Sequence, residues 1–378
     1  MIHLNNAGAS IASDETLQIM IGHLHLEQTL GGYEAAAAKS VELEDFYDQA
    51  AKLIGCDANE IAFSDSASRA WNNLVFSMDF APGDKIITSE IEYGNNVLSL
   101  QRLAEKHDVE LIRLPVDEEG CIDLNDLKSQ LDDNVKLVAV SHAPAHCGTV
   151  LNVREIGRCL TEHSAVYLVD VCQTLGQVDV NVTDIGCDAL VATGRKWLRG
   201  PRGTAFMFIS DELASSLNSN SIGVANAKWS SETKNGSHLS YTQNARRFEC
   251  WERSMAAQLG LVNAINEARQ KDVQKSISQT VQRFRSQLET SIATNAKLHL
   301  YPGNNTQSGI LTFHHNEKLS STLKTELAQQ GINVSVAGEW LAPWDYNKKK
   351  LPDLVRISAH YINTQDEIDA VCLAITRL

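Results

Sequence analysis

From residue 40 to residue 209, short apolar runs alternate with stretches whose apolar residues recur at helical spacing. In 40–54, for example, Leu43, Phe46 and Ala50 fall on one face of a helix. Buried runs separated by helices predict an α/β fold, in which a mostly parallel sheet carries helices on both faces. The predicted strands are 86–89, 109–114, 136–141, 165–170, 188–192 and 204–209, and the predicted helices are 40–54, 96–107, 124–131 and 153–163.

The chain changes character after residue 217. The stretch 218–244 is rich in Ser, Asn, Gly and Thr and is weakly periodic, which predicts a long ordered loop. The remaining predicted elements are a helical region at 256–288 that is bent or interrupted near its middle, strands at 308–314 and 354–358, and a helix at 320–330. We therefore expect a large domain at 15–254 and a smaller α+β domain made of 1–14 and 255–378.

Composition and charge exclude several classes of protein. The 378 residues include 33 basic and 47 acidic side chains, a formal net charge of -14, which argues against a nucleic-acid partner. No apolar run approaches the roughly 20 residues that span a bilayer, so no membrane partner is expected. The start of the chain lacks the pattern of a secretory signal, and the eight cysteines are scattered without a metal-binding spacing. We expect reduced thiols, a cytoplasmic protein and no metal site.

A lysine and an aspartate follow two of the predicted strands. Asp170 ends the apolar run 165–170, and Lys196 lies in 193–197, Thr-Gly-Arg-Lys-Trp, just after the strand at 188–192. Ligands of parallel α/β sheets bind at the carboxyl ends of strands, so the two side chains are expected at one site. A lysine that forms a Schiff base and an aspartate that keeps a ring nitrogen protonated are what pyridoxal 5′-phosphate (PLP) requires. We therefore predict PLP as the cofactor and an amino acid as the substrate.

The phosphate of such a cofactor needs several hydrogen-bond donors. Ser66, Ala67 and Ser68 open a helix-like stretch, so backbone amides and a hydroxyl group there can meet an anion at a helix N-terminus. Thr193 and Arg195 are the other donors expected around the phosphate. The charge of Arg195, together with burial, would also lower the pKa of Lys196 and suit it to act as a base.

Four segments follow one another along the whole chain in a recognisable order: 3–8 (His-Leu-Asn-Asn-Ala-Gly), 169–173 (Val-Asp-Val-Cys-Gln), 193–196 (Thr-Gly-Arg-Lys), and 355–358 (Val-Arg-Ile-Ser) leading into 361–364 (Tyr-Ile-Asn-Thr). Together they resemble the class V aminotransferase family of fold-type I PLP enzymes, which includes cysteine desulfurases, C–S lyases and isopenicillin N epimerase. Segments 194–203 and 331–336 look most similar to the hercynylcysteine sulfoxide lyase branch. The resemblance implies the fold-type I PLP-dependent transferase fold and a homodimer with a shared active site.

The resemblance also implies roles for residues outside the lysine motif. Gln173 matches the residue near the ring hydroxyl, and Tyr93 lies where desulfurases place a histidine that stacks on the ring. Arg356 matches the arginine that pairs with the substrate carboxylate, which a planar guanidinium binds through two hydrogen bonds. Asn6 and Ala7, in the N-terminal motif, are expected at the substrate.

Two departures from the desulfurase pattern bear on the reaction. Trp340 occupies the position of the nucleophilic cysteine, and Glu252 stands where a desulfurase places a phosphate-binding threonine. Cys147 could replace the missing thiol only if it faced the site, and we prefer to interpret it as a small packed cysteine. The sequence therefore disfavours a desulfurase.

The predicted reaction is a PLP-dependent C–S β-elimination from a cysteine conjugate or sulfoxide, which gives pyruvate and ammonia. Arg356 would bind the amino acid, Lys196 would move the Cα proton, and His146 is a candidate acid for the leaving group. An epimerase, aminotransferase or aldolase of the same family is the alternative, because the cofactor supplies chemistry common to all of them. A sensor with the same fold fits less well, since Lys196 and Arg356 are both retained, and no nucleotide-binding motif is present.

Overall fold

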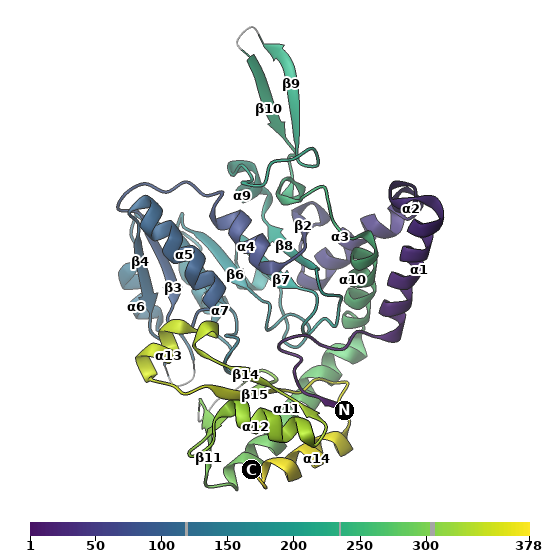
Figure 1. Cartoon of the computed structure of the whole chain (residues 1–378). Coiled ribbons are helices and arrows are strands. Elements are labelled where there is room, and N and C mark those ends of the chain that lie inside the picture. Colours follow the sequence, from purple (N-terminus) through teal and green to yellow (C-terminus); the bar gives the residue numbers. More distant parts are fainter. Residues whose placement is uncertain (118–119, 234–235, 303–306) are drawn as a thin grey trace.

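A seven-stranded sheet forms the centre of the larger part of the molecule (Figure 1). The computed structural model describes residues 1–117, 120–233, 236–302 and 307–378. The strand order is β2-β8-β7-β6-β5-β3-β4; β8 is antiparallel to both β2 and β7, and the other neighbouring strands pair in parallel. The strands are β2 (Ile61–Ser64), β3 (Lys85–Ser89), β4 (Glu110–Leu114), β5 (Val135–Ser141), β6 (Val166–Asp170), β7 (Ala189–Thr193) and β8 (Ala205–Ile209). The predicted mostly parallel sheet is confirmed.

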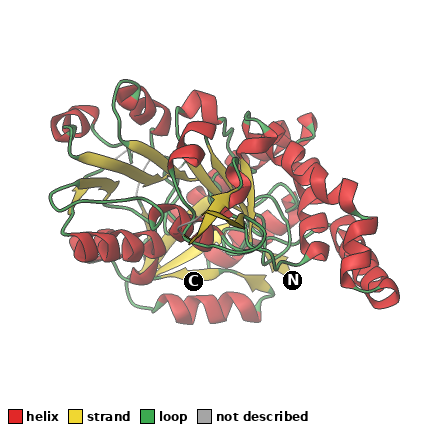
Figure 2. Ribbon diagram, turned by 90° about the horizontal axis from the view of Figure 1, so that it is seen from above, coloured by secondary structure: helices red, strands yellow, loops and turns green. Residues whose placement is uncertain are grey.

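Helices cover both faces of this sheet (Figure 2), because successive residues of the buried strands point to opposite sides. On β5, Val138 and Val140 pack into the core under α3, α7 and α10, whereas Leu137 and Ala139 pack into the core under α4, α5 and α9. Both faces are therefore apolar, which explains the continuous apolar runs. The helices around this sheet are α1 (Asp14–Leu30), α2 (Gly32–Ala38), α3 (Ser40–Ile54), α4 (Ala67–Val75), α5 (Gly94–His107), α6 (Leu124–Gln130), α7 (Val153–Leu160), α8 (Val182–Ile185), α9 (Asp211–Ser216) and α10 (Met255–Ala268).

A second, antiparallel sheet with the order β11-β12-β15-β14 lies below the first in Figure 1. Its core joins α11, α12 and α14 to the strands and includes Leu4 from the start of the chain. The N-terminal strand β1 pairs with β13 in a separate two-stranded sheet, and Figure 1 shows both ends of the chain in this part of the molecule. The elements are β1 (Ile2–His3), α11 (Lys271–Ala293), β11 (Leu298–Tyr301), β12 (Ile310–His315), α12 (Ser320–Gln329), β13 (Ile332–Asn333), β14 (Ser335–Ala337), α13 (Pro343–Lys349), β15 (Leu354–Ser358) and α14 (Gln365–Ile375).

The segment 218–244 differs from its prediction. Instead of an irregular loop throughout, it contains a hairpin of β9 (Ala227–Thr233) and β10 (Gly236–Tyr241) that projects from the body (Figure 1). Trp229 pairs with Leu239 across the two strands, and both side chains are exposed. Because the hairpin projects from the body, its sequence lacks the alternation of apolar and polar residues that marks a strand packed on a core.

Within the described ranges, no helix is both long and apolar enough to cross a membrane.

Candidate active site

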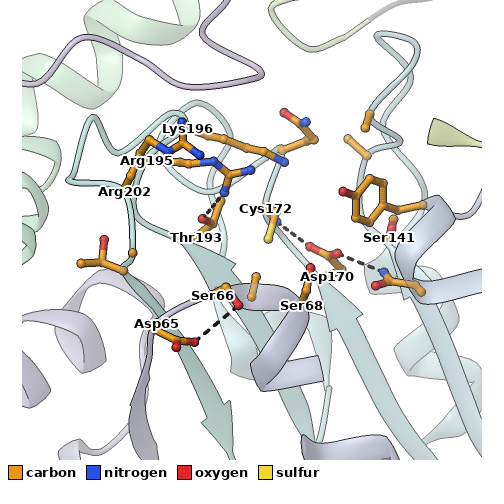
Figure 3. A pocket seen from close by; sticks show the side chains of 18 residues that line it. Asp65, Ser66, Ser68, Ser141, Asp170, Cys172, Thr193, Arg195, Lys196 and Arg202 are labelled. Atoms are coloured by element: carbon orange, nitrogen blue, oxygen red, sulfur yellow. Dashed lines mark hydrogen bonds between the residues drawn. The ribbon is translucent and has the colours of Figure 1, made fainter. Parts of the chain in front are cut away.

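A cavity of about 230 Å³ opens at the carboxyl ends of the parallel strands (Figure 3). Strand order alone brings its walls together, since Ser141, Asp170 and Thr193 end the neighbouring strands β5, β6 and β7. Eight of the predicted site residues line this cavity: Ala67, Ser68, Tyr93, Asp170, Gln173, Thr193, Arg195 and Lys196. The other lining residues are Asp65, Ser66, Asn96, Ser141, Ala143, Ala145, Cys172, Arg202, Gly203 and Thr204.

Lys196 reaches the cavity from a tight turn after β7. The turn is closed by hydrogen bonds from the backbone N of Arg199 to the carbonyl oxygen of Lys196 and from the N of Gly200 to that of Gly194. The Lys196 side chain is buried, and burial lowers its pKa to about 8, with the positive charges of Arg195 and Arg356 acting in the same direction. An amine with such a pKa is partly uncharged near neutral pH and can act as a nucleophile or base.

Asp170 faces the same cavity with both carboxylate oxygens held. Its Oδ1 accepts a hydrogen bond from the backbone N of Cys172 (2.9 Å), and its Oδ2 accepts one from Nδ2 of Asn96 (3.0 Å). Asn96 was not identified from the sequence, although it lies on the first turn of the helix that follows Tyr93. The aspartate is therefore fixed in orientation before any ligand enters.

Gln173 connects the cavity to the N-terminal motif. Its Nε2 donates to the carbonyl oxygen of Ala7 (3.1 Å), and its Oε1 accepts from Nε1 of Trp197 (3.0 Å). Asn6 Nδ2 donates to the carbonyl oxygen of Ser358, and the backbone N of Ala7 donates to Ser358 Oγ. Asn6 and Ala7 are thus buried behind Gln173 and do not line the cavity.

Arg356 approaches from β15 of the second sheet. Its Nη1 donates to the carbonyl oxygen of Ala145 on the cavity wall (2.7 Å), and its Nε donates to Ser335 Oγ (3.0 Å). Arg356 is buried and is not itself a lining residue, yet its charge acts on Lys196. The structure therefore places a guanidinium directly behind the wall that Ala145 forms.

His146 does not reach the cavity. Its Nε2 lies 2.7 Å from Oδ2 of Asp345, and its ring packs against those of Tyr301 and Tyr346. Burial alone would lower the pKa of His146, but Cys147 and Asp345 outweigh burial and raise it to about 9. The predicted contact with a leaving group is absent because Asp345 holds the imidazole behind the wall; Cys147 is buried there too, away from the cavity lining.

The other end of the cavity is rich in donors. The hydroxyl of Ser66 caps α4 by accepting from the backbone N of Arg69, so the first amides of the helix, at Ala67 and Ser68, remain available to an anion. Arg195 Nη1 donates to Thr193 Oγ1 (2.8 Å). Arg202, which was not among the predicted site residues although it belongs to the segment 194–203, lies on the same side of the cavity (Figure 3).

The hydrogen-bond donors and acceptors around the cavity fit PLP. The residues that line the cavity offer cationic groups and helix amides for a phosphate, the Asp170 carboxylate for a ring nitrogen, and the Lys196 amine for a Schiff base. Tyr93 adds an aromatic ring 5.9 Å from the Lys196 Nζ. Each chemical part of the cofactor therefore has a partner in this cavity.

Trp340 lies near this cavity but points out of it. A Cβ atom at Gly94, the residue after Tyr93, would overlap the backbone carbonyl oxygen of Trp340, so the loop that carries Trp340 touches the start of α5. Its indole is 66% exposed and does not line the cavity. Among the lining residues of the described cavity, the thiol is that of Cys172.

Comparison with known proteins gives the family. The model of the class V aminotransferases matches residues 2–371. A probable cysteine desulfurase of Methanothermobacter thermautotrophicus is 27% identical over 342 residues, which are 89% of this chain and 84% of that protein. A cysteine desulfurase of Haloferax volcanii is 22% identical over 99% of this chain and 88% of its own length.

Solved structures agree on the fold. The apo structure of the cysteine desulfurase of Thermococcus onnurineus covers 100% of this chain and 94% of its own with a TM-score of 0.89 and 23% identity. The cystine C–S lyase C-DES, in complex with its reaction product cysteine persulfide, covers 99% of this chain and 97% of its own with a TM-score of 0.86 and 19% identity. A variant of C-DES carries glycine linked to its PLP cofactor.

These relatives correct the prediction of the reaction. The sequence disfavoured a desulfurase because of Trp340 and favoured elimination to pyruvate and ammonia. That prediction is wrong, since two curated relatives that match most of this chain are a probable cysteine desulfurase and a cysteine desulfurase. The predicted family, fold-type I fold and PLP cofactor are confirmed. The chain belongs to the class V aminotransferase family, and it is a PLP-dependent enzyme.

Proposed function

We propose that this chain is a cysteine desulfurase, which converts cysteine and an acceptor thiol into alanine and a persulfide of that thiol. The C–S bond of cysteine breaks, a bond forms between the released sulfur and the acceptor sulfur, and a proton takes the place of sulfur on the cysteine Cβ. The observation that carries the proposal is a 27% identical relative, a probable cysteine desulfurase, of which this chain covers 84%.

The residues of the cavity suit the proton transfers of this reaction. When bound, PLP supplies an electron sink that stabilises negative charge on the substrate Cα. Lys196, with its lowered pKa, is the group we assign to removing and returning the Cα proton. Arg356 is the group we assign to the substrate carboxylate, and Tyr93 is the aromatic ring we assign to one face of the cofactor.

The acceptor thiol is proposed to come from solution. Cys172 lines the cavity, but burial raises its pKa well above that of an ordinary thiol, and the charge of Asp170 adds to this effect. A protonated thiol is a weak nucleophile, so Cys172 is a poor acceptor. Since Trp340 stands where desulfurases carry their nucleophilic cysteine, a small thiol must enter to remove the sulfur.

The test is product analysis with purified, PLP-loaded protein and cysteine. We expect alanine in the mixture and sulfide when dithiothreitol is the acceptor, and we expect both to vanish in Lys196→Ala. The rate of alanine formation should rise with the concentration of added thiol. Pyruvate and ammonia without alanine would contradict the desulfurase, and a sulfur atom found on Cys172 by mass spectrometry would contradict the external acceptor.

We also propose that the enzyme acts as a homodimer and has no nucleic-acid partner. Among the described side chains between residues 222 and 251, several large apolar ones are exposed: Ile222, Val224, Trp229, Leu239 and Trp251. Such a concentration of exposed apolar groups is typical of a protein interface. Analytical ultracentrifugation should give twice the mass of one chain, and Trp229→Asp should shift the enzyme toward the monomer.

A further inference from the structure

One side-chain amide lies between two buried carboxylates at the wall of the active site. Asn96, on α5, donates from Nδ2 to Oε1 of Glu92 (2.9 Å) and to Oδ2 of Asp170 (3.0 Å). An amide nitrogen carries two hydrogens, so each carboxylate receives one. Rotating the amide by half a turn would place its oxygen against two carboxylate oxygens, and the orientation is therefore set by charge.

We propose that Asn96 is the positioning residue for Asp170, and that Glu92 in turn holds Asn96. The proposal concerns the PLP site itself and does not depend on which bond of the substrate breaks. Asp170 is the residue assigned to the pyridine nitrogen of the cofactor. Asn96 affects that nitrogen indirectly, because it holds the Asp170 carboxylate in place. Figure 3 shows the bond to Asp170 on the wall of the cavity.

Glu92 is itself held in place by hydrogen bonds, so it can fix the position of Asn96. Its carboxylate accepts hydrogen bonds from the backbone N of Tyr93 (2.8 Å), from the backbone N of Ser141 (2.7 Å) and from Ser141 Oγ. These donors come from the turn before α5 and from the end of β5, so Glu92 joins two neighbouring elements. The Glu92 side chain is fully buried and leaves the cavity wall to Asn96.

The charges explain why an amide is required at position 96. Burial raises the pKa of Glu92 to about 7, and the nearby negative charge of Asp170 contributes to the rise. Two carboxylates this close repel each other unless a donor lies between them. The Asn96 amide offers both of its hydrogens without adding charge, whereas an aspartate has none to offer and a lysine would add a positive charge beside Lys196.

The proposal makes a prediction about the state of the cofactor ring. With Asn96 in place, the Asp170 carboxylate is held by donors on both oxygens and cannot turn away from the cavity. Without Asn96, Oδ2 loses its partner, and the carboxylate can turn about the remaining hydrogen bond from the backbone N of Cys172 to Oδ1. The ring nitrogen should then be less fully protonated, and the cofactor should bind more weakly by about tenfold, the loss typical of one hydrogen bond to a charged group.

The test uses Asn96→Leu, which has a similar shape but no donor, and Asn96→Ala, which is smaller and remains informative if the leucine variant does not fold. The matched control is Ser99→Ala. Ser99 lies one turn further along α5, where its Oγ accepts from Trp71 Nε1 and donates to the carbonyl oxygen of Asn96. The control therefore removes buried hydrogen bonds from the same helix without touching Asp170.

Each variant is loaded with PLP labelled with ¹⁵N in the ring, and the ring-nitrogen signal is recorded by NMR at neutral pH. The dissociation constant for PLP is measured by visible absorption, and folding is checked by circular dichroism. We expect both Asn96 variants to move the ring-nitrogen signal toward the unprotonated form and to weaken PLP binding about tenfold. Ser99→Ala should lower the melting temperature and leave the ring signal unchanged. A wild-type signal and affinity in folded Asn96→Leu or Asn96→Ala would overturn the proposal.

Discussion

Arg356 donates a 2.7 Å hydrogen bond from Nη1 to the carbonyl oxygen of Ala145, and this bond joins the small antiparallel sheet to the wall of the active site. Ser335 Oγ and Asn5 Oδ1 accept two further hydrogens of the guanidinium, at 3.0 and 3.5 Å. Three elements distant in the sequence therefore hold one cation beside the cavity. A group held in this way is oriented before a substrate arrives.

Replacing Arg356 by lysine should weaken substrate binding. A lysine keeps the charge but cannot form the paired hydrogen bonds of a guanidinium, so we expect KM for cysteine to rise about tenfold or more. The dissociation constant for PLP should change little, because other residues of the cavity are assigned to the phosphate and to the ring nitrogen. Steady-state kinetics and a PLP titration separate the two effects; an unchanged KM would remove Arg356 from the substrate site.

Lys196 should be unusually reactive in the cofactor-free protein. Because its pKa is about 8, the amine loses its proton as the pH rises through 8. An ordinary lysine loses its proton at a pH of about 10.4. Reductive methylation of the apo protein at a series of pH values, read by peptide mass spectrometry, should give a midpoint near 8 for Lys196. A midpoint equal to that of the surface lysines would contradict the assigned burial effect.

Arg202 should contribute to holding the phosphate of PLP. It lies at the cavity beside Thr204, and the described residues provide it with no ion pair. Because the side chain is partly in solvent, we expect Arg202→Ala to weaken PLP binding by roughly threefold to tenfold. Arg69→Ala is the matched control, since Arg69 pairs with Asp65 and does not line the cavity. Equal affinities in the two variants would argue against a phosphate contact.

His360 should make the enzyme sensitive to acid. The imidazole is buried against Trp197, whose carbonyl oxygen accepts from Nε2 (3.1 Å), and burial lowers the pKa of His360 to about 3. The unfolded chain binds this proton near pH 6.5, so the stability that a neutral His360 contributes is present above 6.5 and is lost as the pH falls toward 3.

The size of this effect can be measured against a variant that does not titrate. Below pH 6 the free energy of unfolding should fall by about 1 kcal/mol per pH unit because of His360. His360→Gln keeps a donor for the Trp197 carbonyl, and its stability should depend less on pH in this range. Denaturant titrations at pH 4 and 7 give the free energy of unfolding of each protein at both pH values. An equal change in this free energy between pH 7 and pH 4 in the two proteins would show that His360 is not the titrating group.

Local patterns predicted much of the fold. The helix α3 begins and ends at the residues predicted, 40 and 54, and β5 and β6 differ from their predictions by one residue at the start. These elements carry their own signal, because buried strands are apolar on both faces and amphipathic helices repeat at their own period. The hairpin of β9 and β10 carries no such signal, since it projects from the body (Figure 1).

The active site, like the fold, was predicted from the sequence only in part. The sequence alone determined the cofactor, because Lys196 and Asp170 follow strands whose ends must meet at one edge of a parallel sheet. The packing of the folded chain, by contrast, pairs His146 with Asp345 behind the wall, brings Arg202 to the cavity, and sets Asn96 between Glu92 and Asp170. Those relationships join elements that are distant in the chain, and the direction of each side chain depends on its partners rather than on its neighbours in sequence.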